Sequence, residues 1–293
     1  MALVSRYLDA ELVERLNHME LSARRVVEGS TIGLHKSPMK GASVEFRQHR
    51  FYTPGDEPRR LDWRVLARTD RPYIKEYDEE TNLRCMLMLD VSGSMSYGRL
   101  HGTKFDAAAK IAASLAYLML RQTESVGLAT FADKIASYLP PRAASSQLSQ
   151  VIDQLERTDP RGKSSLPDAV QEIADRIGRR ALVIVISDFF TPLTKIREAF
   201  ARLNYEGHET LCLQLVDPDE EQFPFRNWSR FSGLEGETPM LAEPAMIRKA
   251  YLENFRNHQQ QLVSSCRSLG VAHHLYLTDQ LLADWLTKII RRR

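Results

Sequence analysis

Cysteine is scarce in this chain: three of its 293 residues are Cys85, Cys212 and Cys266. They are odd in number and include no CxxC pair, and the first two lie in apolar runs that predict strands. A disulfide framework therefore has no support, and the usage is typical of a reducing compartment. We expect a cytoplasmic protein.

A long uninterrupted apolar segment is also missing. The most apolar stretch, Ala107 to Leu120, contains Lys110 and falls short of the roughly 18 to 20 residues that cross a bilayer. Near the start of the chain, Arg6, Asp9 and Glu11 interrupt the region where a secretion signal would need its apolar core. The sequence therefore predicts neither a membrane span nor secretion.

Charge of one sign is not in excess, because 40 Lys and Arg stand against 38 Asp and Glu. Hydrophobic residues make up 43% of the chain, which also has 14 Gly and 13 Pro. This balance excludes disordered, collagen-like and coiled-coil chains. A chain of this length buries roughly 75% of its unfolded surface, which predicts one or two domains with a full core.

Apolar runs alternate with helical patterns after residue 82. Six runs predict strands: Leu83–Leu89, Val126–Phe131, Ile135–Leu139, Ala181–Ile186, Thr210–Val216 and Val271–Leu277. Helical patterns separate most of them: Lys104–Arg121, Gln147–Leu155, Pro167–Ile177, Leu193–Leu203, Pro244–Leu269 and Gln280–Ile290. Buried parallel strands read as continuous apolar runs, so we predict an α/β fold with a doubly wound, mainly parallel sheet.

The first 80 residues have a different texture. Apolar spacing between Asp9 and Val27 predicts a helix, and repeated Gly and Pro after it predict turns and short strands. We therefore predict two domains, a small N-terminal module at 1–80 and the α/β domain at 81–293. Within the second, aromatic residues among Gly and Pro predict a β-hairpin insertion at 223–243.

Residues 24–75 are locally basic, with 12 Lys and Arg against 6 Asp and Glu and with aromatic residues among the arginines. Nucleic-acid binding through this region is therefore an alternative function. A packed module in which Arg59 or Arg68 pairs with Asp56 or Asp62 is the structural alternative, and docking of a partner protein is another.

Oxygen-bearing side chains follow the ends of predicted strands. Asp90, Ser92 and Ser94 follow the first strand, Asp188 follows the fourth, and Ser164 lies in a turn between them. Ligands bind outside the carboxyl ends of parallel strands, so these side chains are expected to converge. Carboxylates and hydroxyls suit Mg²⁺, or Mn²⁺ or Ca²⁺. The structural alternative is that they form turns and cap helices.

This set resembles the metal-ion-dependent adhesion site of the von Willebrand factor A family. Asp90, Ser92 and Ser94 match its DxSxS motif, Asp188 matches its third-loop Asp, and Ser164 replaces its second-loop Thr. The resemblance implies that the hydroxyls bind the ion directly, that one or both aspartates commonly act through water, and that a partner's acidic residue fills an open position. Serine lacks the methyl group that restrains threonine, so we expect weaker or partner-dependent occupancy.

A second motif resembles the RxYxPGDxxRxIDWxxxAR signature of a large prokaryotic family, the domain of unknown function number fifty-eight, with Leu61 in place of Ile. The matching residues are Arg50, Tyr52, Pro54, Gly55, Asp56, Arg59, Asp62, Trp63 and Arg68. The resemblance implies an A-like domain that acts with a MoxR-type AAA+ ATPase in chaperone-like protein remodelling or maturation.

Other patterns point to chemistry less strongly. Gly162-Lys163-Ser164 resembles the tail of a phosphate-binding loop, but Arg157 occupies the position of its first glycine. His273 and His274 would point to opposite faces of a strand and cannot share an ion. Metal-assisted hydrolysis is a weaker alternative, because the sequence shows no general base beside the ion. We therefore expect a non-enzymatic interaction module.

Overall fold

The computed structural model describes residues 5–17, 19, 44–53, 61–79, 83–178, 180–236 and 238–291. They form two compact units. The larger unit contains the described residues before position 20 and from 83 onward, and the smaller contains those from 44 to 79. Each unit is described by itself.

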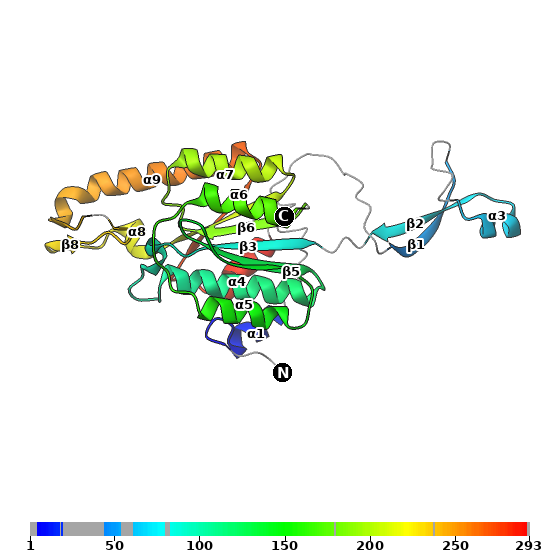
Figure 1. Ribbon diagram of the computed structural model, residues 1–293, viewed down its shortest axis with the longest axis horizontal. Coiled ribbons are helices and arrows are strands. Elements are labelled where there is room, and N and C mark those ends of the chain that lie inside the picture. Colours follow the sequence, from blue (N-terminus) through cyan, green and yellow to red (C-terminus); the bar gives the residue numbers. More distant parts are fainter. Residues whose placement is uncertain are drawn as a thin grey trace. The chain divides into compact units, whose positions relative to one another are not determined.

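A six-stranded sheet forms the centre of the larger unit (Figure 1). Its strands are β3 (Arg84–Asp90), β4 (Ser125–Phe131), β5 (Ile135–Arg142), β6 (Leu182–Ser187), β7 (Glu209–Val216) and β10 (Ala272–Leu277). The order is β10-β7-β6-β3-β4-β5, and every pair is parallel except β4 with β5. The predicted doubly wound, mainly parallel α/β fold is therefore confirmed.

Helices cover both faces of this sheet (Figure 1). They are α1 (Ala10–Asn17), α4 (Lys104–Arg121), α5 (Gln147–Glu156), α6 (Leu166–Ile177), α7 (Leu193–Tyr205), α9 (Pro244–Ser268) and α10 (Leu282–Arg291). The short helix α8 (Pro218–Gln222) follows β7 and has no buried residues. Alternate residues of β3 point to opposite faces. Leu87 packs in the core shared with α4 and α5, and Met88 packs in the core shared with α6 and α7.

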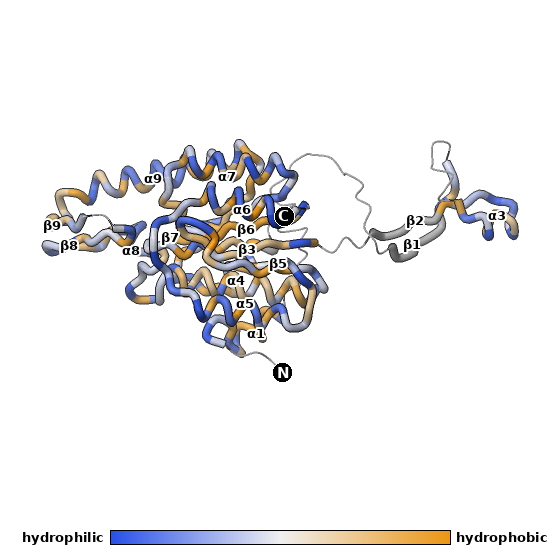
Figure 2. Tube along the Cα trace, in the orientation of Figure 1, coloured by the Kyte–Doolittle hydropathy of each residue, from blue (hydrophilic) through white to orange (hydrophobic). Residues whose placement is uncertain are grey.

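Hydrophobic residues concentrate in the strands and on the inner faces of the helices (Figure 2). Buried apolar area supplies most of the stabilisation of such a core. Cys85, Cys212 and Cys266 are buried and unpaired within it. Among the described residues, none of the helices is both long and apolar enough to cross a membrane.

Helix α1 belongs to the sheet unit, although the predicted boundary placed it in a module ending at residue 80. Leu8 and Leu16 are buried in the core shared with α4. The Tyr117 hydroxyl donates a 2.6 Å hydrogen bond to the Asn17 side chain. The helix lies here because burying its apolar face against the sheet layer removes that face from water.

The smaller unit contains β1 (Val44–Phe51) paired antiparallel with β2 (Tyr73–Glu79), and α3 (Trp63–Thr69) between them in sequence. Asp62 caps α3, because its Oδ1 accepts hydrogen bonds from the backbone N–H groups of Arg64 and Val65. Asp62, one of the residues of the predicted signature, is therefore the N-cap of α3.

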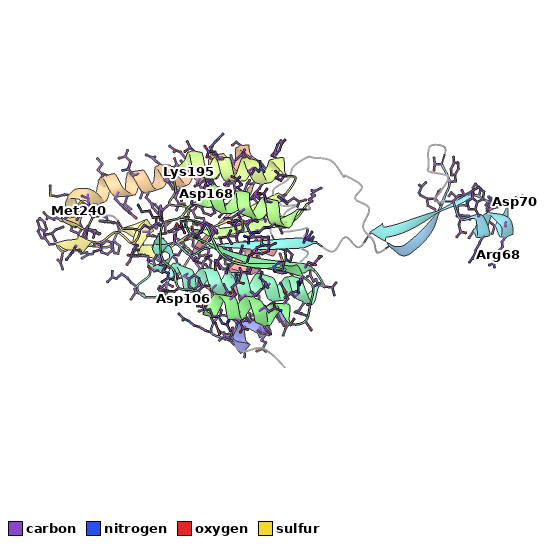
Figure 3. All side chains as sticks on the ribbon, in the orientation of Figure 1. Arg68, Asp70, Asp106, Asp168, Lys195 and Met240 are labelled. Carbon is purple, nitrogen blue, oxygen red and sulfur yellow. The ribbon has the colours of Figure 1, made fainter. Side chains whose placement is uncertain are left out.

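The hairpin predicted within 223–243 is present as β8 (Ser229–Phe231) paired antiparallel with β9 (Met240–Ala242). Aromatic rings hold it to its surroundings, since Phe223 stacks on Phe231 and contacts Tyr251. Its outer side chains include Met240, labelled in Figure 3. Exposed apolar residues gather here: Trp228, Leu234, Met240, Leu241 and Met246.

Candidate functional site

Asp90 ends the central strand β3 and is buried. Its Oδ1 accepts a 2.9 Å hydrogen bond from the Ser92 N–H. Its Oδ2 accepts from the hydroxyls of Ser164 at 3.0 Å and Ser187 at 2.7 Å. Three chain segments that are far apart in sequence therefore meet at one carboxylate.

The serines of the DxSxS motif lie together beside Asp90. The Oγ atoms of Ser92 and Ser94 are 3.2 Å apart, and Ser94 lies in a short 3₁₀ helix, Gly93–Ser96. A Cβ atom on Gly93 would lie 2.0 Å from the Leu234 carbonyl oxygen. Glycine is therefore required here, and the insertion lies against the DxSxS loop.

Backbone hydrogen bonds fix the loop that carries Ser164. The Gly93 N–H donates to the Gly162 carbonyl at 2.8 Å, and the Arg161 N–H donates to the Val91 carbonyl at 2.8 Å. Gly162 has φ +87, a conformation that favours glycine. A groove of about 1050 Å³ lies beside this loop and is lined in part by Lys163.

The helix α5, rather than a strand, precedes the Gly162-Lys163-Ser164 segment. A phosphate-binding loop follows a strand directly, so this segment lacks the required context. Likewise His273 and His274 are successive residues of β10, and His273 Nε2 contacts Gln214 Oε1 at 3.1 Å. The structure therefore supports neither a phosphate-binding loop at Gly162-Lys163-Ser164 nor a shared ion at His273 and His274.

Asp188, the fifth predicted ligand, has a cationic partner that the sequence analysis missed. The Lys104 ammonium lies 2.7 Å from Asp188 Oδ2 and 2.6 Å from Glu220 Oε1, and the Lys104 residue is 1% exposed. Thr103 and Asp106 form a capping box that starts α4 at Lys104 and so fixes its position. A cation in the first turn of a helix is unfavourable against the helix dipole unless an anion lies nearby. The position of Lys104 at the start of α4 was therefore the one sequence signal that it has an acidic partner.

The backbone after β6 is strained where it turns away from the site. Phe189 has φ 56, a left-handed conformation that bulky residues rarely adopt. Its N–H donates to Ser187 Oγ at 3.0 Å, and the Phe190 N–H donates to Asp188 Oδ1 at 3.2 Å. The second of these bonds orients the Asp188 carboxylate, and such strain is commonly found at functional sites.

Burial and a like charge shift the ionisation of Asp90. Burial and, to a smaller extent, the neighbouring Asp188 carboxylate together raise the pKa of Asp90 to about 6, although the hydrogen bonds from Ser187 and Ser92 act to lower it. Burial alone would lower the pKa of Lys104, but the carboxylates of Asp188 and Glu220 outweigh it and hold it above its ordinary value. Lys104 is therefore protonated at neutral pH.

Two oxygen–oxygen distances around Asp90 are compatible with the shell of a small divalent cation. In an octahedron with Mg–O distances of about 2.1 Å, adjacent oxygens lie about 3.0 Å apart. Ser164 Oγ lies 3.0 Å from Asp90 Oδ2, and Ser92 Oγ lies 3.2 Å from Ser94 Oγ. Among the residues that the structure describes, no group of three or more His, Cys, Asp or Glu side chains could hold a metal.

The charges also fit a dication. Asp90, Asp188 and Glu220 carry three negative charges when ionised, and Lys104 neutralises one of them. These groups therefore keep a net negative charge, and the buried Asp217 next to Glu220 adds to it. Buried charges are costly unless they are paired, so a cation would be favoured here.

Five of the nine signature residues are described: Arg50, Tyr52, Asp62, Trp63 and Arg68. The other four, Pro54, Gly55, Asp56 and Arg59, lie outside the described residues. Asp62 has the structural role of a helix cap. Trp63 is 64% exposed, so this aromatic side chain lies on the surface of the smaller unit.

Comparison with known proteins agrees with the sequence motifs. A family profile described as "Protein of unknown function DUF58" matches residues 48–261. Uncharacterized proteins of Mycobacterium tuberculosis (strain H37Rv) and Mycobacterium bovis are each 26% identical over 288 residues, covering 97% of this chain and 89% of theirs.

Solved structures with a related arrangement include an aerotolerance-related membrane protein from Bacteroides fragilis. It has a TM-score of 0.48 and 16% identity, covering 72% of this chain and 100% of that one. The conserved hypothetical protein BatB from Bacteroides thetaiotaomicron has a TM-score of 0.45 and 14% identity, covering 71% and 98%. Because the family profile spans most of its length, this chain belongs to the DUF58 family of proteins of unknown function.

Proposed function

We propose that this protein is a non-enzymatic interaction module that binds a divalent cation and presents it to an acidic side chain of a partner protein. Asp90, Ser92, Ser94 and Ser164 would hold the ion, with Asp188 acting through water. Mg²⁺ is the ion that fits best, with Mn²⁺ or Ca²⁺ as substitutes. The bound ion would supply a Lewis-acidic position for the partner's carboxylate.

The observation that carries this proposal is that the Ser164 hydroxyl donates to the buried Asp90 carboxylate at 3.0 Å, while the hydroxyls of Ser92 and Ser94 lie 3.2 Å apart in the loop that follows Asp90. Ser94 and Ser164 are half-buried, whereas Asp90 and Ser92 are fully buried. Asp90 and Ser92 therefore lie in the protein interior, and solvent reaches the proposed ligands at Ser94 and Ser164. An external carboxylate could reach the ion from that side.

A MoxR-type AAA+ ATPase, or a client of that ATPase, is the partner that we propose on the basis of the family resemblance. The complex would remodel or mature other proteins. The exposed apolar side chains of the insertion next to the DxSxS loop offer additional contact area, because such patches commonly mark interaction surfaces.

The two other functions considered have less support. Lys104 is protonated at neutral pH and is therefore not a candidate general base for metal-assisted hydrolysis. Within the basic region 24–75, Asp62 caps α3, which gives this part of the region a structural role.

Calorimetric titration with Mg²⁺ tests the proposed ion site. Wild type is expected to bind, and Asp90→Ala is expected to lose binding because the only direct carboxylate ligand is removed. Asp175→Ala, which removes an exposed aspartate from α6, is the matched control. If Asp90→Ala does not fold, Ser164→Ala replaces it. Equal Mg²⁺ affinity for wild type and these site variants would show that Mg²⁺ does not bind at Asp90 and Ser164, and would exclude the proposed ion site.

A further inference from the structure

Lys104 connects the candidate ion site to a separate part of the fold. Its ammonium contacts Asp188, in the loop after β6, and Glu220, in α8. It also lies 5.1 Å from the ring centroid of Phe190 and 6.0 Å from that of Tyr97. One buried cation is therefore shared by two carboxylates and flanked by two aromatic rings.

Glu220 has a second role that ties this cation to the start of α8. Its Oε2 accepts a 2.9 Å hydrogen bond from the Asp217 N–H, and Asp217 Oδ1 accepts from the Asp219 N–H at 2.9 Å. Together these form the capping box of α8. A change in how Glu220 is paired therefore acts directly on the helix start.

Helix α8 leads into the hairpin insertion through a constrained turn. Phe223 has φ 47 and is buried, and its ring stacks on Phe231 of β8. Asp219 of α8 also accepts from Arg99 at 3.2 Å, in the segment after the DxSxS loop. Helix α8 is thus held to the segment after the DxSxS loop through Asp219 and Arg99, and to the hairpin through Phe223 and Phe231.

We propose that Lys104 couples the occupancy of the ion site to α8 and the hairpin insertion. This inference rests on the proposed function. A dication and the Lys104 ammonium compete for the Asp188 carboxylate, and the two cations repel each other. Ion binding therefore weakens the Lys104–Asp188 pair and leaves Glu220 as the main partner of Lys104. Lys104 is a positioning residue that carries this change to the α8 capping box.

Mg²⁺ titration of two variants of the full chain separates this role from a purely structural one. Lys104→Met removes the competing cation and is expected to bind Mg²⁺ about tenfold tighter than wild type. Glu220→Gln leaves Lys104 with Asp188 alone and is expected to bind Mg²⁺ more weakly. A structural role predicts weaker binding in both variants, and that result would overturn the inference.

Hydrogen exchange with and without Mg²⁺ tests the coupling itself. In wild type, Mg²⁺ is expected to slow exchange of the amides from Asp217 to Phe223. Lys104 then pairs mainly with Glu220, and this holds the Glu220 side chain in the capping box that starts α8. In Lys104→Met, Mg²⁺ binds but exchange in this segment is expected to be unchanged. Binding of Mg²⁺ to wild type with no change in this segment overturns the coupling and leaves the ion site intact.

Two further outcomes concern a wild type that does not bind Mg²⁺ and a Lys104→Met variant that does not fold. Failure of wild type to bind Mg²⁺ overturns both the proposed function and the coupling. If Lys104→Met does not fold, the double variant Lys104→Met with Glu220→Gln removes one charge of each sign. The same Mg²⁺-dependent slowing in this variant as in wild type would overturn the role of Lys104, and its loss would support it.

Discussion

Ser164 and Asp90 are 74 positions apart in sequence, yet the Ser164 hydroxyl donates a 3.0 Å hydrogen bond to the Asp90 carboxylate. This contact joins the second loop of the site to the end of β3. It places a half-buried hydroxyl next to a fully buried carboxylate. The relationship makes Ser164 the most informative residue for testing how the site holds an ion.

Changes at Ser164 should alter Mg²⁺ affinity in opposite directions. Ser164→Thr keeps the hydroxyl and adds a methyl group that restrains its rotamer, so we expect Mg²⁺ affinity to rise by about threefold. Ser164→Ala removes the ligand and should lower affinity by about tenfold or more. Calorimetry measures both, and thermal unfolding without metal checks that the fold is retained. Equal affinities in all three proteins would exclude Ser164 as a ligand.

The contact between the DxSxS loop and the insertion predicts a steric effect at Gly93. Gly93→Ala places a Cβ atom 2.0 Å from the Leu234 carbonyl oxygen, so we expect a loss of about 1 to 3 kcal/mol in the free energy of unfolding. Gly236→Ala in the insertion meets no atom within 4 Å and bears only the cost of its positive φ, so it serves as the control. Urea unfolding compares the two. A smaller loss for Gly93→Ala than for the control would contradict the packing of Leu234 on this loop.

His208 predicts a pH dependence of stability. It is 5% exposed, its Nδ1 accepts a 3.2 Å hydrogen bond from the Ala181 N–H, and burial lowers its pKa. The unfolded chain therefore binds a proton more readily than the folded one. Stability from the neutral ring is present above about pH 6.5 and is lost as the pH falls through the lower folded value.

The measurement compares unfolding at pH 7.5 and 5.5 for wild type and His208→Asn, whose amide oxygen can still accept the hydrogen bond. Wild type is expected to lose more stability on acidification than the variant. His101→Asn, an exposed position, is the control and should behave as wild type. An identical pH dependence in all three proteins would show that His208 does not contribute.

The cap at Asp62 predicts a local effect in the smaller unit. Asp62→Ala removes both hydrogen bonds to the first turn of α3, which should cost about 1 kcal/mol. Hydrogen exchange at Arg64 and Val65 should accelerate by about fivefold. Asp62→Asn retains an acceptor and should exchange nearly as wild type. Unchanged exchange in Asp62→Ala would mean that the cap does not stabilise α3.

The sheet could be predicted because buried parallel strands leave a direct mark on sequence. The run Ala181–Ile186 predicted β6 to within one residue at each end. Buried on both faces, such a strand has no polar positions to blur its limits. The serines and aspartates at strand ends were found for a related reason, since the topology brings those ends to one edge.

The cationic partner of Asp188 could not be predicted in the same way. Lys104 and Asp188 are 84 positions apart, and periodicity alone does not show which carboxylate a buried lysine pairs with. The attachment of α1 to the sheet unit was missed because an amphipathic pattern marks the face to be buried and not its partner. Both gaps concern long-range contacts, which tertiary packing decides.

The most direct test of the ion site is a crystal structure of the full chain grown with Mn²⁺ and measured for anomalous scattering. The account predicts an anomalous peak about 2.0 to 2.6 Å from the hydroxyl oxygens of Ser92, Ser94 and Ser164, beside Asp90. It also predicts that the distance between Lys104 Nζ and Asp188 Oδ2 then exceeds the present 2.7 Å, while Lys104 stays paired with Glu220. Absence of any peak among these residues, with the Lys104–Asp188 pair unchanged, would contradict it.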